Sequence, residues 1–221
     1  MAILYKTAVT LQKLLLNIFA DWEVTGGENV PPGGPLIVAS NHLSQCDPSY
    51  ITIAVKRHVR FLAKRELFAH PISSPLLYAY GAHPLNRSNV DVNAYKWAIN
   101  LLTTDGTLAL FPEGTRSPKG LRKARTGIVK LALLTGAPIL PLAITGTENF
   151  GNWARGVFVP TAKIRVTVGT PFSLPVIEGR ISNAVAESLL NTIMERIAFL
   201  LPPKYRGVYQ IPTGNRDKNA R

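Results

Sequence analysis

The feature that most constrains the fold is a series of short apolar runs separated by segments with helical spacing. Runs typical of strands occur at 36–40, 59–63, 82–87, 107–111, 138–144 and 163–168. Segments typical of helices lie near 47–56, 88–104, 127–135 and 181–200, and Ser88 could cap the second of them. Strands that alternate with helices are typical of an α/β domain. The sequence therefore predicts a mostly parallel central sheet flanked by helices.

The size of the chain fits one domain of this kind. It has 221 residues, of which 46% are hydrophobic and 17% charged, enough apolar material for a substantial core. The predicted domain covers 21–211, preceded by a helix over 1–20 and followed by a disordered tail over 212–221. The uncharged run 131–147 contains two prolines and two glycines. It is better explained by a helix end, a turn and a buried strand than by a membrane span.

The segment 2–20 predicts an amphipathic helix with a narrow polar face. Lys6, Thr10, Lys13 and Asn17 follow one another at helical spacing, and most other positions are apolar. Two lysines on one face argue against a spanning helix, but a helix that lies at a membrane surface tolerates them. Two interpretations stay open: a helix that contacts a membrane surface, or an ordinary helix packed on the core.

The charge pattern indicates an anionic partner. The formal net charge is +12, with the basic excess concentrated in 56–130. Such a field attracts nucleic acid, phosphorylated metabolites or an anionic membrane surface. No nucleic-acid-binding motif accompanies it, so we expect no nucleic-acid partner. The one cysteine excludes an internal disulfide and fits a reducing compartment.

A histidine and an aspartate lie five positions apart in "NHLSQCD" (41–47), between the apolar run 36–40 and Pro48. His42 could act as a general base whose tautomer Asp47 fixes, provided that the residues between them curl back. Alternatively, Asp47 only caps the helix that Pro48 begins, and His42 is a structural histidine. This stretch alone does not decide between the two interpretations.

Three further stretches place polar residues at strand ends. In "FPEGTRS" (111–117), the strand over 107–111 is followed by Glu113, Thr115 and Arg116, where α/β folds place ligands. Arg116 offers a planar fork that suits phosphate, unless it is only a surface arginine. "GAHPLNR" (81–87) ends in Arg87, and "PILPLAITG" (138–146) is an apolar strand interrupted by Pro141.

Taken in order, these four stretches resemble the blocks of the glycerolipid acyltransferase family, in particular the 1-acyl-sn-glycerol-3-phosphate (lysophosphatidic acid) acyltransferases. That family shows an N-H-x-x-x-x-D block, a G-x-x-x-x-x-R block, an F-P-E-G-T-R-S block and a proline-containing apolar strand. The third block matches here at all seven positions. The resemblance covers 36–147 closely and continues more loosely to 167–172 and 205–209.

The resemblance implies a role for each matching residue. His42 would be the general base and Asp47 would orient it. The acceptor hydroxyl would attack the thioester of acyl-CoA or acyl-carrier protein, which are co-substrates, so no cofactor is expected. Arg87 and Arg116 would hold the acceptor phosphate. The residues that would shape or line the acceptor pocket are Glu113, Gly114, Thr115 and Lys64.

Some positions depart from the family pattern or suggest other chemistry. The second block carries His83, Pro84 and Asn86 where bulky apolar residues are usual. This departure bears on how the acceptor is bound and does not bear on the fold. Lys64 has the alternative of being a solvated charge. Cys46 lies beside His42, but the block requires no nucleophile there, so we interpret it as a small filler. The histidines lack metal-ligand spacing, so no metal is expected.

The sequence thus predicts an acyltransferase that forms phosphatidic acid and associates with the cytoplasmic face of an anionic membrane. A different acceptor stays possible: glycerol 3-phosphate, another lysophospholipid or a glycolipid. A rival from another class is an acyl-thioester hydrolase, and a non-enzymatic rival is a lipid-binding protein with the same fold. The sequence does not determine the donor, the acyl chain length or the oligomeric state.

Overall fold

The computed structural model describes residues 2–71, 73–87, 91–177 and 179–210. Its centre is a seven-stranded sheet in the order β1-β7-β6-β2-β5-β3-β4. Neighbouring strands are parallel except β6 and β7, which are antiparallel. The strands are β1 (Asp21–Thr25), β2 (Leu36–Ser40), β3 (Val59–Lys64), β4 (Ala82–Leu85), β5 (Thr107–Leu110), β6 (Ile139–Thr145) and β7 (Lys163–Val168).

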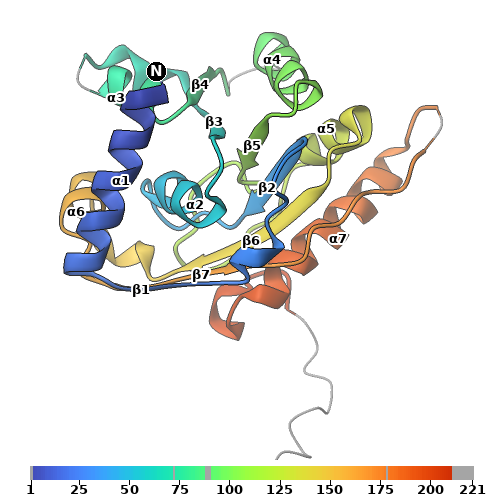
Figure 1. The fold of residues 1–221 in the computed structure, drawn as a ribbon. Helices are drawn as coiled ribbons and strands as arrows, with labels where there is room; N and C mark the ends of the chain where they lie inside the picture. The colour runs from blue at the N-terminus through green and yellow to red at the C-terminus, as the bar shows by residue number, and fades with distance from the viewer. Residues whose placement is uncertain (1, 72, 88–90, 178, 211–221) are drawn as a thin grey trace, which may run out of the picture.

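Helices cover both faces of this sheet (Figure 1). One face carries α1 (Ala2–Phe19), α2 (Asp47–Val55) and α6 (Trp153–Phe158), and the other carries α4 (Val92–Thr103), α5 (Gly127–Thr135) and α7 (Asn183–Leu200). Helix α3 (Ser73–Ala79) lies near the β4 edge beside α1. Short 3-10 turns are η1 (Gly27–Asn29), η2 (Arg65–Ala69), η3 (Thr147–Phe150) and η4 (Pro203–Tyr205).

The central strands are apolar because each of their faces packs against helices. All five residues of β2 are buried, as expected for a parallel strand covered on both sides. Ile37 and Ala39 belong to the apolar cluster beneath α4, α5 and α7. Leu36 and Val38 belong to the cluster beneath α1 and α2. The sheet therefore separates two apolar clusters. Because successive side chains of β2 point to opposite faces of the sheet, this one strand contributes residues to both clusters.

This architecture confirms the predicted α/β fold. The predicted strands at 36–40 and 163–168 and the predicted helix at 127–135 match β2, β7 and α5. Helix α6 was not predicted, because its six residues are too short for a periodic pattern. The predicted tail over 212–221 lies outside the described residues.

Two predicted helix caps are wrong. Asp47 was a candidate cap of α2, but α2 begins at Asp47 itself, after Cys46, and no side chain caps it. The Asp47 carboxylate turns back into the preceding loop instead. The expected cap of α4, Ser88, lies outside the described residues. Asp91 is the actual cap, and its carboxylate accepts a hydrogen bond from the Ala94 backbone N–H at 3.0 Å.

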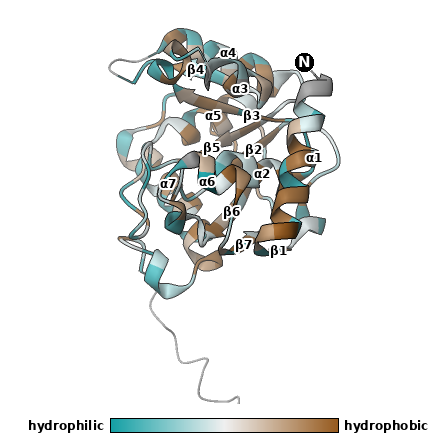
Figure 2. Ribbon diagram, turned by 90° about the vertical axis from the view of Figure 1, so that its left-hand side faces the viewer, coloured by the Kyte–Doolittle hydropathy of each residue, from teal (hydrophilic) through white to brown (hydrophobic). Residues whose placement is uncertain are grey.

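Helix α1 packs on the domain through one side only. Tyr5, Gln12 and Leu16 are buried, and the helix contacts α2, α3, α6 and β1. Leu14 and Ile18 on its outer side are 54% and 61% exposed, and Figure 2 shows α1 as a largely apolar helix on the outside of the domain. Within the described ranges, no helix combines the length and hydropathy that a membrane crossing requires.

The parallel strands β2, β5, β3, β4 and β6 place their carboxyl ends along one edge of the sheet. The residues at or just after these ends include His42, Glu113, Lys64, Arg87 and Thr147, in the same strand order. This edge is where open α/β sheets bind ligands. The fold therefore gathers the predicted site residues at one edge.

Candidate active site

The loop between β2 and α2 brings His42 and Asp47 together. The distance between His42 Nδ1 and Asp47 Oδ2 is 2.8 Å. The Asp47 side chain is fully buried, whereas the His42 side chain is 14% exposed. A carboxylate at Nδ1 holds the proton on that nitrogen, which leaves the Nε2 lone pair available to accept another proton. The pair has the geometry of a general base and its orienting group.

Asp47 is held by more than His42. Its Oδ2 atom accepts hydrogen bonds from the backbone N–H groups of Leu43 at 2.7 Å and Ser44 at 2.8 Å. Its Oδ1 atom accepts from the Thr147 hydroxyl at 2.6 Å. These donors compensate for the lost hydration of a buried carboxylate. Asp47 therefore organises the loop that carries His42, which explains why it does not cap α2.

Thr147 was not predicted as a site residue. It is fully buried at the start of η3, directly after β6 and Gly146. The available signal was its position: a hydroxyl residue following the fourth block, at the carboxyl end of a parallel strand. Local spacing gives no sign of a partner 100 residues away.

Asn41 fixes the point where β2 gives way to the loop. Its side-chain amide donates to the Ile144 carbonyl at 2.8 Å, and its side-chain oxygen accepts from the Ile144 N–H at 2.8 Å. The Asn41 side chain thus makes the two hydrogen bonds to β6 that a backbone residue of β2 would make if the strand continued. The asparagine that precedes the histidine in the first block therefore has a structural role.

Residues of the third block hold both the ring and the backbone of His42 in place. Its ring stacks on Phe111 with centroids 3.9 Å apart and an angle of 16° between the planes. The backbone N–H of His42 donates to Glu113 Oε1 at 3.1 Å, and the backbone carbonyl of His42 accepts from the Ser117 backbone N–H at 2.6 Å. The first and third blocks are thereby joined, although 71 residues separate His42 from Glu113.

Glu113 is buried and serves the loop backbone. Its side chain is 4% exposed, and its second oxygen accepts from the Arg122 N–H at 2.9 Å. Burial raises the pKa of Glu113 to about 7, against the opposing effect of these two backbone donors. Both oxygens bind backbone groups, so Glu113 shapes the site by holding the loops in place. Its predicted contribution to acceptor binding stays a prediction.

The remaining predicted residues surround this loop. Arg87 reaches across from the end of β4, and its Nη1 atom donates to the Gly114 carbonyl at 2.8 Å. Gly114 has a φ of +69°, a conformation that favours glycine. Thr115 and Arg116 are exposed. Lys64 is half exposed, and its Nζ atom lies 3.5 Å from Glu66 Oε1.

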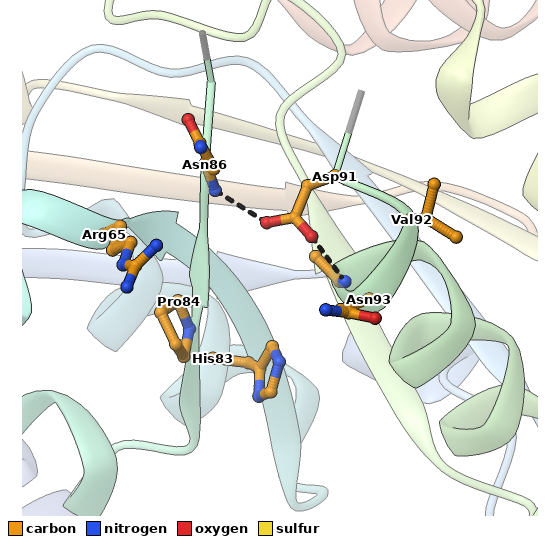
Figure 3. Close-up of a pocket in the computed structure, with 8 residues that line it drawn as sticks. Arg65, His83, Pro84, Asn86, Asp91, Val92 and Asn93 are labelled. Carbon is orange, nitrogen blue, oxygen red and sulfur yellow. Dashed lines mark hydrogen bonds between the residues drawn. The ribbon is translucent and has the colours of Figure 1, made fainter. Parts of the chain in front are cut away.

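A cavity of about 520 Å³ lies between β4 and the start of α4 (Figure 3). Its lining includes His83, Pro84 and Asn86, the residues by which this chain departs from the second block of the family. The Asn86 N–H donates to Asp91 Oδ2 at 2.8 Å, and this bond joins the two walls of the cavity. The His83 ring stacks on Trp97 with centroids 4.2 Å apart. The departures therefore cluster at one place, next to Arg87.

The chemistry of Cys46 does not suit a nucleophile. Its side chain is 2% exposed, and burial raises the pKa of the thiol to about 11. The thiol therefore stays protonated near neutral pH. No group of three or more metal-ligating side chains occurs in the part of the chain that the structure describes.

The Acyltransferase family model matches residues 21–145, the segment that contains the first three blocks and all but the last residue of the fourth. The chain belongs to the Acyltransferase family. The matched segment extends from the start of β1 to the end of β6. His42, Asp47 and Glu113 all lie within this segment.

Several relatives and a solved structure resemble the chain. A "1-acyl-sn-glycerol-3-phosphate acyltransferase" of Borreliella burgdorferi is 33% identical over 130 residues, which cover 58% of this chain and 52% of that protein. The protein of the same name from Bacillus subtilis is 25% identical over 169 residues, which cover 76% of this chain and 82% of that protein. The aligned part of this chain spans only about half the length of the Borreliella relative.

The crystal structure of the 1-acyl-sn-glycerophosphate acyltransferase PlsC from Thermotoga maritima has the same fold. The TM-score is 0.69 at 27% identity, over 89% of this chain and 78% of that one. The similarity therefore includes most of the sheet and its covering helices, beyond the four blocks.

Proposed function

We propose that this protein transfers a fatty acyl group from a thioester, acyl-CoA or acyl-carrier protein, to the sn-2 hydroxyl of 1-acyl-glycerol 3-phosphate. The product is phosphatidic acid. The observation that carries the proposal is the 2.8 Å contact between His42 and Asp47 at the ligand-binding edge of the sheet. The names of the relatives supply the acceptor.

The proposed reaction is a direct transfer. His42 Nε2 takes the proton of the acceptor hydroxyl, and the oxygen attacks the thioester carbonyl carbon. When the tetrahedral intermediate collapses, the C–S bond breaks, and the leaving sulfur takes the proton from the imidazolium. The Asp47 carboxylate stabilises the imidazolium while it exists. No acyl-enzyme forms, in keeping with the buried thiol of Cys46.

The acceptor is placed by the loops around Gly114. Arg87 and Arg116 carry the positive charge for its phosphate, and Lys64 adds a third exposed cation. Thr115 lies at the surface of the same loop, while Glu113 holds that loop from beneath. Guanidinium groups suit a phosphate because their planar fork matches its oxygens.

A product assay tests this function. The purified protein is supplied with acyl-CoA or acyl-carrier protein and a panel of lysolipids, and the acylated product is identified by mass spectrometry. We expect phosphatidic acid from wild type and a loss of at least about a hundredfold in His42→Ala. Thiol release without an acceptor would indicate a thioester hydrolase instead. Full activity of a folded His42→Ala variant would refute the mechanism.

We also propose that the protein associates peripherally with the cytoplasmic face of an anionic membrane. The outer side of α1 combines Leu11, Leu14 and Ile18, each about half exposed or more, with the exposed Lys6 and Lys13. Apolar side chains of such a helix enter the headgroup region while lysines contact anionic lipids. The acceptor is itself a membrane lipid, so this contact would bring the site to its substrate.

Surface substitutions test this contact better than deletion of α1, because deletion would uncover the buried Leu16 and Gln12. Leu14→Asp with Ile18→Asp should reduce sedimentation with phosphatidylglycerol vesicles at least about tenfold. A matched control places aspartates at two exposed valines elsewhere, Val176 and Val185. Equal loss of binding in both double variants would show that net charge matters and that α1 does not.

A further inference from the structure

A second arginine lies against Gly114. A Cβ atom built on Gly114 would lie 3.2 Å from Nε, 3.4 Å from Cδ and 3.6 Å from Cζ of Arg125. The Arg125 side chain therefore passes directly over the glycine whose carbonyl accepts the hydrogen bond of Arg87. Two guanidinium groups, from the β4 end and from the loop before α5, converge on one residue of the third block.

Neither guanidinium forms an ion pair with a carboxylate among the described residues. The ion pairs of the described residues are those of His42 with Asp47, Lys64 with Glu66, and Arg165 with Asp21 and Glu23; none includes Arg87 or Arg125. Burial lowers the pKa of Arg87, the charge of Arg125 lowers it further, and Glu66 opposes both. Like charges brought together without a direct ion pair are typical of a site that binds an anion.

The backbone around Arg125 is anchored. Its own N–H donates to the Pro112 carbonyl at 2.9 Å. The preceding N–H, of Ala124, donates to the Tyr209 hydroxyl at 3.2 Å. Arg122, three residues earlier, donates its N–H to Glu113. The basic loop is therefore tied to the third block and to the C-terminal segment, so Arg125 is positioned over Gly114 rather than carried on a free surface loop.

We propose that Arg125 and Arg87 together bind the phosphate monoester of the acceptor, an inference that rests on the proposed function. His42 follows β2 and Gly114 follows β5, which are adjacent strands. Adjacent strands are roughly 4.8 Å apart, close to the span from the sn-2 oxygen of a glycerol phosphate to its phosphorus. An acceptor with its hydroxyl at His42 would thus place its phosphate near Gly114, within reach of both arginines.

The test compares Arg125→Gln with Lys123→Gln, an exposed cation of the same loop. Steady-state kinetics are measured with lysophosphatidate and with acyl-CoA as the varied substrate. For Arg125→Gln we expect the KM for lysophosphatidate to rise about tenfold to a hundredfold, the effect of losing hydrogen bonds to a charged group. The KM for acyl-CoA should be unchanged. Lys123→Gln should resemble wild type, and Arg125→Lys should be intermediate because it keeps the charge without the fork.

Three results would overturn the assignment. They are equal kinetics of Arg125→Gln and Lys123→Gln, a fall in kcat with unchanged KM, or a rise in the KM for acyl-CoA alone, which would place the donor phosphates at Arg125. A binding measurement separates this inference from the proposed reaction. Calorimetric titration with sn-glycerol 3-phosphate should detect binding to wild type that is at least about tenfold weaker in Arg125→Gln, even if no acyl transfer to lysophosphatidate is found.

Discussion

Asp47→Asn would separate the charge of the buried carboxylate from its geometry. The asparagine oxygen can keep the hydrogen bonds from Leu43, Ser44 and His42 that Oδ2 accepts at 2.7–2.8 Å. The amide nitrogen would then face the Thr147 hydroxyl, which can accept as well as donate. The loop should therefore stay in place while the negative charge disappears.

The magnitude follows from the burial and the distance. During proton transfer His42 becomes an imidazolium beside a carboxylate, and unit charges about 4 Å apart attract by roughly 4 kcal/mol at an effective dielectric constant of about 20. Asp47 is fully buried, so solvent screens it little. Part of this attraction is replaced by the amide dipole. A net loss of about 3–4 kcal/mol corresponds to a fall in kcat/KM of roughly 10²–10³.

The assay is the rate of phosphatidic acid formation, with urea unfolding as the control for folding. Because His42 and Asp47 act as one unit, the double variant with His42→Ala should be no slower than His42→Ala alone. A folded Asp47→Asn enzyme that keeps more than about a third of the wild-type kcat/KM would refute the electrostatic role. A further large loss in the His42→Ala background would show that Asp47 acts independently of His42.

Three other predictions concern groups around the pair. Thr147→Val removes a hydroxyl donor from the buried Asp47 and should lower the free energy of unfolding by about 1–3 kcal/mol; unchanged stability and kcat would contradict its positioning role. Glu113 has a pKa raised by burial from 4.5 to about 7, so the folded state binds the proton more tightly than the unfolded state. Its contribution to stability should therefore fall by roughly 3 kcal/mol as pH rises from about 4.5 to 7, and this slope in urea unfolding should be absent in Glu113→Gln. Cys46→Ala should keep acyl-transfer activity, and the wild-type thiol, with its pKa raised to about 11 by burial, should resist iodoacetamide at pH 8.

The interior of the sheet was predictable because its strands carry their own evidence. The runs at 36–40 and 163–168 matched β2 and β7, since a buried strand must be apolar and a half-covered strand must alternate. Less regular segments were harder to predict. Helix α6 has six residues, and the cap of α4 was assigned to the wrong residue because several polar residues precede that helix.

The sequence by itself determined the four blocks, their order and the strand ends on which they lie, because these features are local. The tertiary structure decided how the blocks meet. It turned Asp47 away from the helix and toward His42, gave Thr147 and Asn41 partners 100 and 103 residues away, and placed Arg125 over Gly114. Such contacts depend on the strand order β6-β2-β5-β3-β4. Local periodicity carries no information about that order, which is set by how the helices cover both faces of the sheet.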